Sequence, residues 1–224
     1  MLEGGAPQVE TKVQNVVASG NLSQHLDLDS ILKVTPRANY DPAKFPGLVY
    51  RLKKPATTTL LFSTGRMICT GAKSERSAKT AITRIVNELK DHGILVLGKP
   101  DVRIENIVAT GDLGGIIDLE DAAEHLAKTM YEPEQFPGLI FRMDDPKAVI
   151  LIFASGKLVI TGTKREIEVK LAVQRLRETL NRHGLIFCQK PPNGSIPAKL
   201  SRSAAPTVSV VLFDDNVLKK KIAA

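Results

Sequence analysis

The sequence predicts an α+β fold made of two fused copies of one half-domain, related by a pseudo-twofold axis. The main observation is an internal repeat: residues 40–73 recur without a gap as residues 131–164, each pairing with the residue 91 positions later (136 − 45 = 91). A unit of this size that occurs only twice is unlike a solenoid. Strand-like runs followed by one long helix in each copy predict a sheet of about ten strands with helices on one face.

The first copy is expected to contain one strand, a short helix and three further strands before its long helix. Residues Val9–Ser19 alternate in the manner of a strand, and Asp27–Lys33 suits a short helix that Pro36 ends. The three further strands are expected at Pro46–Leu52, Thr57–Ser63 and Arg66–Gly71.

Each copy is expected to end in a long amphipathic helix. In the first copy Ser74 is the expected N-cap, the helix continues to about Asp91, and Gly93 ends it. The second copy repeats this order and ends in a helix over residues 165–182, followed by Gly184.

The repeat divides the chain into four segments. Residues 1–8 are expected to be a flexible N-terminal arm, residues 9–99 the first half-repeat, and residues 100–190 the second. Residues 191–224 match neither copy and form a C-terminal tail of unknown role. The two copies could pack as one sheet or follow each other as two separate domains.

Composition narrows the class of protein. A net charge of +7 and an isoelectric point near 9.4 favour an anionic partner. The amino terminus lacks the apolar core and basic flank of a signal peptide, and no apolar run approaches the roughly 18 residues of a membrane span. Cys69 and Cys188 have neither metal-site nor redox spacing and imply no disulfide framework, which fits a reducing intracellular compartment. Neither a metal nor a cofactor is expected.

The predicted strands are apolar on both faces. With a period of two residues, Leu60 and Phe62 share one face, and the alternate position Leu61 is apolar as well. The expected helices can cover only one face of the sheet, so the other would be a bare apolar surface, which is typical of a binding site. The alternative is a sandwich in which the two halves bury these faces against each other.

Four segments carry a resemblance to a known family. Two are long, FPGLVYRLKKPATTTLLFSTGRMICTGAK and FPGLIFRMDDPKAVILIFASGKLVITGTK, and the short segments QNVV and ENIV precede them. Over about residues 9–188 the chain resembles the TATA-box-binding proteins, which are general transcription initiation factors. The resemblance implies a saddle: a curved, ten-stranded antiparallel sheet whose concave face grips the DNA minor groove, with helices on the convex face.

The resemblance also implies roles for individual residues. Phe45 with Phe62, and Phe136 with Phe153, would intercalate as wedges at the two ends of a short A·T-rich site. The minor-groove contacts would come from Asn15, Val17, Leu60, Ile68, Thr70, Asn106, Val108, Leu151, Val159 and Thr161. The phosphate contacts would come from Arg51, Arg66, Lys73, Arg142, Lys157 and Lys164.

Two features depart from the family pattern. The turn that holds Lys53-Lys54 in the first copy holds Asp144-Asp145 in the second, and Glu105 stands where Gln14 stands in the first copy. A DNA backbone repels nearby carboxylates. We therefore expect the second half to hold DNA less strongly by charge, and the Asp144-Asp145 turn is a candidate partner site.

The sequence thus indicates a general transcription factor that binds and bends the TATA-box minor groove and nucleates the preinitiation complex. Its expected partners are double-stranded, A·T-rich promoter DNA, a transcription factor B-type protein that docks at Glu132 and Glu134, and indirectly RNA polymerase. The alternative is a protein–protein assembly module that uses the apolar face without sequence-specific DNA binding.

An enzyme is not expected, because no carboxylates or thiols cluster around the four histidines. The short segment before the first copy favours an archaeal-type protein, located in the cytoplasmic nucleoid, over a nuclear eukaryotic one.

Overall fold

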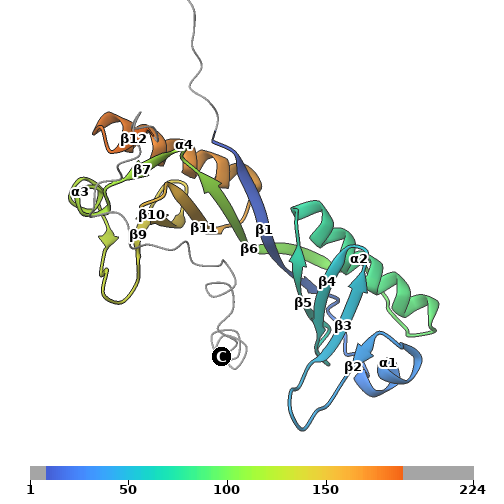
Figure 1. Ribbon diagram of the computed structural model, residues 1–224. Helices are drawn as coiled ribbons and strands as arrows, with labels where there is room; N and C mark the ends of the chain where they lie inside the picture. Colours follow the sequence, from blue (N-terminus) through green and yellow to red (C-terminus); the bar gives the residue numbers. More distant parts are fainter. Residues whose placement is uncertain (1–8, 189–224) are drawn as a thin grey trace, which may run out of the picture. The chain divides into compact units, whose positions relative to one another are not determined.

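The computed structural model describes residues 9–188, in which ten strands form one antiparallel sheet (Figure 1). The strand order is β2-β3-β4-β5-β1-β6-β11-β10-β9-β8, so the two repeats meet at the central pair β1–β6. Because the halves share one hydrogen-bonded sheet, the sandwich alternative is wrong. The strands of the sheet are β1 Thr11–Asn21, β2 Ala38–Asn39, β3 Leu48–Lys53, β4 Ala56–Leu61, β5 Arg66–Ala72, β6 Asp101–Asp112, β8 Thr129–Met130, β9 Gly138–Met143, β10 Ala148–Phe153 and β11 Lys157–Thr163.

Each half contributes one short and one long helix. Asp27 and Asp118 cap the short helices, since the carboxylate of each accepts two backbone N–H groups of the first turn. Ser74 caps the first long helix through a hydrogen bond from the Ser77 N–H to its Oγ (3.1 Å), as the sequence predicts. The helices are α1 Leu28–Val34, α2 Glu75–Asp91, α3 Leu119–His125 and α4 Glu166–Arg182.

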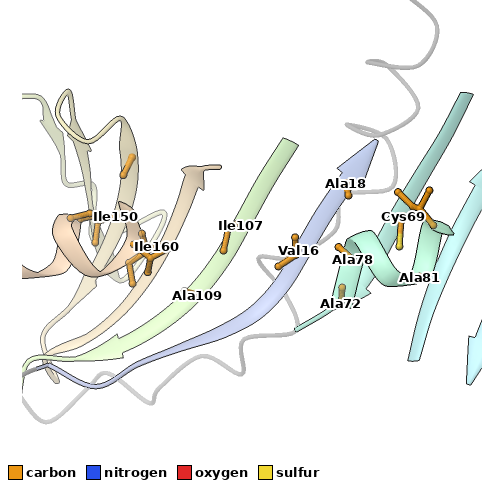
Figure 2. Close-up of a cluster of buried hydrophobic side chains, with 14 of the residues drawn as sticks. Val16, Ala18, Cys69, Ala72, Ala78, Ala81, Ile107, Ala109, Ile150 and Ile160 are labelled. Carbon is orange, nitrogen blue, oxygen red and sulfur yellow. The ribbon is translucent and has the colours of Figure 1, made fainter. Parts of the chain in front are cut away.

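The core lies between the sheet and the helices. Alternate side chains on the strands, such as Val16, Met67 and Ile107, are fully buried and belong to one cluster with the buried faces of the helices. Figure 2 shows Ala78 and Ala81 of α2 close to Cys69 of β5. Small side chains at this contact allow the helix backbone to approach the sheet closely.

The two long helices begin next to each other. The backbone N–H of Glu75 donates to Oε1 of Glu166 over 2.7 Å, and the N–H of Glu166 donates to Oε1 of Glu75 over 2.6 Å. Each carboxylate therefore lies at the N-terminus of the helix of the other half, where the helix dipole stabilises a negative charge. This reciprocal capping links the halves on the helical side of the sheet.

Among residues 9–188, a second, two-stranded sheet forms in the second half and not in the first. It pairs β7 (Gly115–Ile117) with β12 (Ile186–Cys188), a pairing that the sequence pattern did not indicate. At the equivalent place in the first half, the side chain of Gln24 links its own segment to the segment that contains Leu95 and Leu97. Its Nε2 donates to the Leu95 carbonyl (2.8 Å) and its Oε1 accepts from the Leu97 N–H (2.9 Å).

The predicted fold class is confirmed: an α+β molecule of two fused repeats with a ten-stranded antiparallel sheet. Residues 9–188 belong to one compact unit, so the halves are not separate domains. The expected arm, residues 1–8, and the expected tail, residues 191–224, lie outside the described residues. Within residues 9–188 no helix has the length and apolarity of a membrane span, and no group of three potential metal ligands gathers.

Candidate nucleic-acid interface

The face of the ten-stranded sheet opposite α2 and α4, which we call the open face, carries the residues predicted to contact DNA. Side chains alternate along each strand, so Leu60 and Ile68 lie opposite the helix-packed Leu61 and Met67. The second-half residues Val108, Leu151, Phe153 and Val159 are only 6–8 % exposed. They nevertheless lie outside the cluster that packs on the helices.

The four predicted wedge phenylalanines form two matching pairs. The ring centroids of Phe45 and Phe62 lie 6.0 Å apart at an interplanar angle of 65°, and those of Phe136 and Phe153 lie 5.9 Å apart at 63°. Such edge-to-face contacts fix both rings against each other. In each pair the first ring comes from the loop that precedes β3 or β9. The second ring is that of Phe62, directly after β4, or of Phe153, the last residue of β10.

A glycine supports each wedge pair. A Cβ at Gly47 would lie 2.6 Å from Cε1 of Phe45 and 3.0 Å from Cε1 of Phe62. Gly138 has the same surroundings, because a Cβ there would lie 2.7 Å from Cε1 of Phe136. The rings therefore pack directly on the backbone at these positions, and any larger residue would displace them.

The predicted base-contacting asparagines are oriented by the neighbouring strand. Oδ1 of Asn15 accepts the Gly71 N–H over 2.7 Å, and its Nδ2 lies 3.2 Å from Oγ1 of Thr70. The Gly71 N–H therefore identifies the inner amide atom as oxygen, which leaves the NH₂ group as the donor. Asn106 repeats this arrangement with Gly162 (2.9 Å) and Thr161 (3.1 Å).

The predicted groove-floor residues form cross-strand pairs on the open face. Leu60 pairs with Ile68 between β4 and β5, and Leu151 pairs with Val159 between β10 and β11. In the middle of the sheet, Val17 pairs with Asn106 and Asn15 with Val108. The register thus brings together all ten residues expected to contact the minor groove: Asn15, Val17, Leu60, Ile68, Thr70, Asn106, Val108, Leu151, Val159 and Thr161.

The six predicted phosphate-contacting cations are all exposed: Arg51, Arg66, Lys73, Arg142, Lys157 and Lys164. Two of them have partners, since Nζ of Lys73 donates to the Gln14 carbonyl (2.6 Å) and Nζ of Lys164 pairs with Glu105 (3.3 Å). The predicted partner-docking residues Glu132 and Glu134 are also exposed, in the loop before Phe136. This loop is closed by the Phe136 N–H, which donates to the Glu132 carbonyl.

The comparisons with known proteins agree with this geometry. The family model described as transcription factor TFIID, or TATA-binding protein, matches residues 10–92 and 101–183, which are the two repeats. The chain belongs to this family. The TATA-box-binding protein of Pyrodictium occultum is 51 % identical over 176 residues, which are 79 % of this chain and 88 % of that protein. The counterpart from Pyrobaculum calidifontis is 49 % identical over 179 residues, covering 80 % and 90 % of the two chains.

A solved structure supports the same assignment. The structure of Methanococcus jannaschii TBP matches with a TM-score of 0.70 and 47 % sequence identity, and the match covers 77 % of this chain and 99 % of that one. The two-repeat sheet described above is therefore the fold of the TATA-box-binding family.

Within this TATA-box-binding family member, the acidic turn of the second half is engaged in internal ion pairs. Asp145 pairs with Arg175 of α4 (2.6 Å), and Asp144 pairs with Lys128. The carboxylates are thus balanced by cations of their own half. The expected role of this turn as a partner site stays a prediction.

In the first half, the carboxylate that balances the equivalent cations lies on α2. Glu88 lies 2.9 Å from Nε of Arg84 and 3.3 Å from Nη1 of Arg37, and it accepts the Tyr50 hydroxyl over 2.6 Å. Burial alone would raise the pKa of Glu88, but the hydrogen bonds from Tyr50 and Arg84 and the charge of Arg37 outweigh it and lower the pKa. Burial raises the pKa of Tyr50, and its hydrogen bond to Glu88 and the charge of that carboxylate raise it further. We call Arg37, Tyr50, Arg84 and Glu88 the Glu88 cluster.

The sequence alone did not reveal the glycines that support the open face. Gly71 and Gly162 adopt positive φ angles of 93° and 89°, at the irregularities where β5 and β11 donate to the asparagines. The one signal in the sequence was that glycine stands at equivalent positions of both repeats, at Gly71 and Gly162 and again at Gly47 and Gly138. Identity alone did not distinguish a support for the site from an ordinary turn residue.

Proposed function

We propose that this chain is a general transcription factor whose open face binds and bends the minor groove of a TATA-like promoter element, and so nucleates the preinitiation complex. The observation that carries this proposal is the duplication of the whole constellation. One face presents two wedge pairs, two oriented asparagines and two apolar floors at a constant offset. A pseudo-twofold surface suits a duplex, whose two strands are themselves related by a twofold axis.

The chemistry of the face favours A·T pairs. In the minor groove an A·T pair presents only the acceptors adenine N3 and thymine O2, whereas guanine adds an amino donor. The asparagine NH₂ groups of Asn15 and Asn106 supply donors to these acceptors. A guanine amino group would press on the apolar floor around Leu60 and Leu151, where it would find no acceptor.

The wedge pairs supply the bend. Insertion of an apolar ring between base steps partly unstacks them, at a cost of about a few kcal/mol per step, and kinks the duplex. The exposed cations, such as Arg51 and Arg142, then contact phosphates along a longer stretch of DNA. These electrostatic contacts and the apolar floor offset the cost of unstacking.

The proposal includes protein partners but no bond-making chemistry and no cofactor. Glu132 and Glu134 would dock a transcription factor B-type protein on the second half, which gives the complex its direction, and RNA polymerase would follow indirectly. Because the compared relatives come from archaea, we place the protein at the nucleoid of an archaeal cell.

The test is a fluorescence-transfer bending assay with end-labelled duplexes that carry either an A·T box or a G·C-substituted box. The wild-type chain should bend the A·T duplex only, with and without a transcription factor B-type protein. The doubles Phe45→Ala/Phe62→Ala and Phe136→Ala/Phe153→Ala should each lose bending. They should also lose about tenfold or more in affinity, which corresponds to about 1.4 kcal/mol.

The matched control is Phe187→Ala, which removes a phenylalanine of β12 that is 51 % exposed and is not part of either wedge pair. It should bend DNA like the wild type. If both wedge doubles kept full bending, the wedge assignment would be wrong. Salt-sensitive binding to both duplexes without bending would instead favour the alternative, a protein-assembly module with a basic surface.

A further inference from the structure

The open face carries two polar clusters that are related by the repeat and differ by one functional group. The members of the first, which we call the first-half node, are Gln14, Lys73 and Thr110. The members of the second, the second-half node, are Glu105, Lys164 and Ser19. The same offset relates every member (14 + 91 = 105, 73 + 91 = 164, 19 + 91 = 110). The two nodes are therefore structural equivalents.

Each node is closed by a hydrogen bond that crosses from one repeat to the other. Nε2 of Gln14 donates to Oγ1 of Thr110 over 2.9 Å, and Oγ of Ser19 donates to Oε1 of Glu105 over 2.6 Å. Both hydroxyl residues pair with groove-floor residues of the neighbouring strands. The nodes consequently lie on the open face.

The amide and the carboxylate occupy equivalent bulges. The register between β1 and β6 shifts around Gln14, which has no cross-strand partner there, and it shifts again around Glu105. Each of these residues directly precedes a predicted base-contacting asparagine, Asn15 or Asn106. The bulges thus place one neutral and one charged side chain at matching positions beside the proposed DNA contact.

The lysines of the two nodes differ in what balances their charge. Nζ of Lys73 donates to the Gln14 carbonyl over 2.6 Å, so its charge has no anionic partner in the node. Nζ of Lys164 lies 3.3 Å from Oε2 of Glu105. The hydrogen bond from Ser19 and then the Lys164 ammonium lower the pKa of Glu105, although burial opposes them, so the carboxylate is ionised at neutral pH.

We propose that Glu105 makes the second half the weaker of the two grips on the DNA backbone, because a phosphate must displace it from Lys164. The inference rests on the proposed function, since it requires that the open face receives DNA. The side chains of Lys164 and Glu105 are 64 % and 43 % exposed, so the pair can open without leaving a buried charge. No carboxylate of its node competes with a phosphate for Lys73. The two halves therefore contact phosphates with different strength, which gives the pseudo-twofold molecule a direction on the DNA.

The test measures the salt dependence of binding to an A·T duplex for a set of variants. Each phosphate contact contributes about −0.9 to the slope of log K against log salt concentration. Glu105→Gln, which keeps the shape and the Ser19 partner, should steepen the slope by about 0.9. Lys164→Gln should change it little in the wild-type background but flatten it by about 0.9 in the Glu105→Gln background.

The first half supplies the matched controls. Lys73→Gln should flatten the wild-type slope by about 0.9, and Gln14→Glu should make a subsequent Lys73→Gln silent. The inference is overturned if Lys164→Gln flattens the wild-type slope as much as Lys73→Gln does, or if Glu105→Gln leaves the slope unchanged while the A·T duplex is still bent. Failure of the wild-type chain to bind the duplex at all would overturn the proposed function as well.

Discussion

At the scale of single residues, each open-face asparagine depends on a glycine for its orientation. The Gly71 N–H fixes Oδ1 of Asn15, and the Gly162 N–H fixes Oδ1 of Asn106. Both glycines have a φ near +90°, a conformation that L side chains rarely adopt. The donor that the protein presents to a base is therefore set by backbone geometry on the neighbouring strand.

The two glycines should differ in their tolerance of alanine. Both substitutions introduce strain of about 1–3 kcal/mol at the positive φ. A Cβ at Gly71 would also lie 3.2 Å from the Ala56 carbonyl oxygen, whereas the nearest atom to a Cβ at Gly162 is the Val149 nitrogen at 3.6 Å. Denaturant unfolding should show a larger loss of stability for Gly71→Ala than for Gly162→Ala. Equal losses would mean that crowding at Gly71 has no effect.

At the scale of secondary-structure elements, the two halves place equivalent charges on different elements. In the first half the carboxylate is Glu88 on α2, which pairs with Arg37 and Arg84. In the second half the carboxylates are on the β9–β10 turn, at Asp144 and Asp145. Each half thereby ties its long helix to the adjacent hairpin, since Arg84 also donates to the Lys54 carbonyl.

The Glu88 cluster should make stability depend on pH. Because the folded-state pKa of Glu88 lies below its unfolded value, its ionised form stabilises the fold above the unfolded value of about 4.5, and this contribution is lost as the pH falls through the folded pKa. Glu88→Gln should therefore lower the free energy of unfolding by about 1–3 kcal/mol at pH 7. The difference from wild type should shrink in acid, as measured by urea unfolding between pH 7 and pH 3.

A control for this experiment is Glu178→Gln on α4, because Glu178 accepts a hydrogen bond from the neutral amide of Gln174. This surface substitution should change stability by about 0.5 kcal/mol or less. The free energies of unfolding of the wild type and of Glu88→Gln should differ less at pH 3 than at pH 7. A difference that stayed constant down to pH 3 would rule out the ionised carboxylate as its cause.

At the scale of the whole described molecule, the halves are joined in the sheet by the β1–β6 pair and at the helices by the reciprocal caps of Glu75 and Glu166. The side-chain hydrogen bonds Gln14–Thr110 and Ser19–Glu105 also cross between the halves. Backbone hydrogen bonds join β1 to β6 within the sheet, and the caps join α2 to α4 on its helical side. The halves should consequently behave as one cooperative unit.

The reciprocal caps predict an effect that crosses between the halves. Glu75→Ala should speed amide hydrogen exchange at the first turn of α4, because the Glu166 N–H loses its acceptor there. The overall loss of stability should be about 1 kcal/mol, as for other lost helix caps. Glu166→Ala should have the converse effect on α2. Faster exchange confined to the substituted helix would contradict the reciprocal arrangement.

The sequence by itself determined the repeat, the order of the main elements and the helix cap at Ser74, whereas the wedge, groove and phosphate roles rest on the resemblance to the family and stay predictions. These features could be predicted because periodicity, capping and repetition are local or are visible as matching letters. The element ends differed by one or two residues, as for α1, expected at Asp27–Lys33 and observed at Leu28–Val34.

Only the tertiary structure decided how distant residues meet. The Asn15–Gly71 bond, the reciprocal Glu75–Glu166 caps and the β7–β12 pair join residues 56, 91 and about 70 positions apart. The single-residue bulges at Gln14 and Glu105 likewise arise from the pairing of β1 with β6. Register depends on which side chains the whole sheet can bury together, and that long-range condition leaves no pattern in a single stretch of sequence.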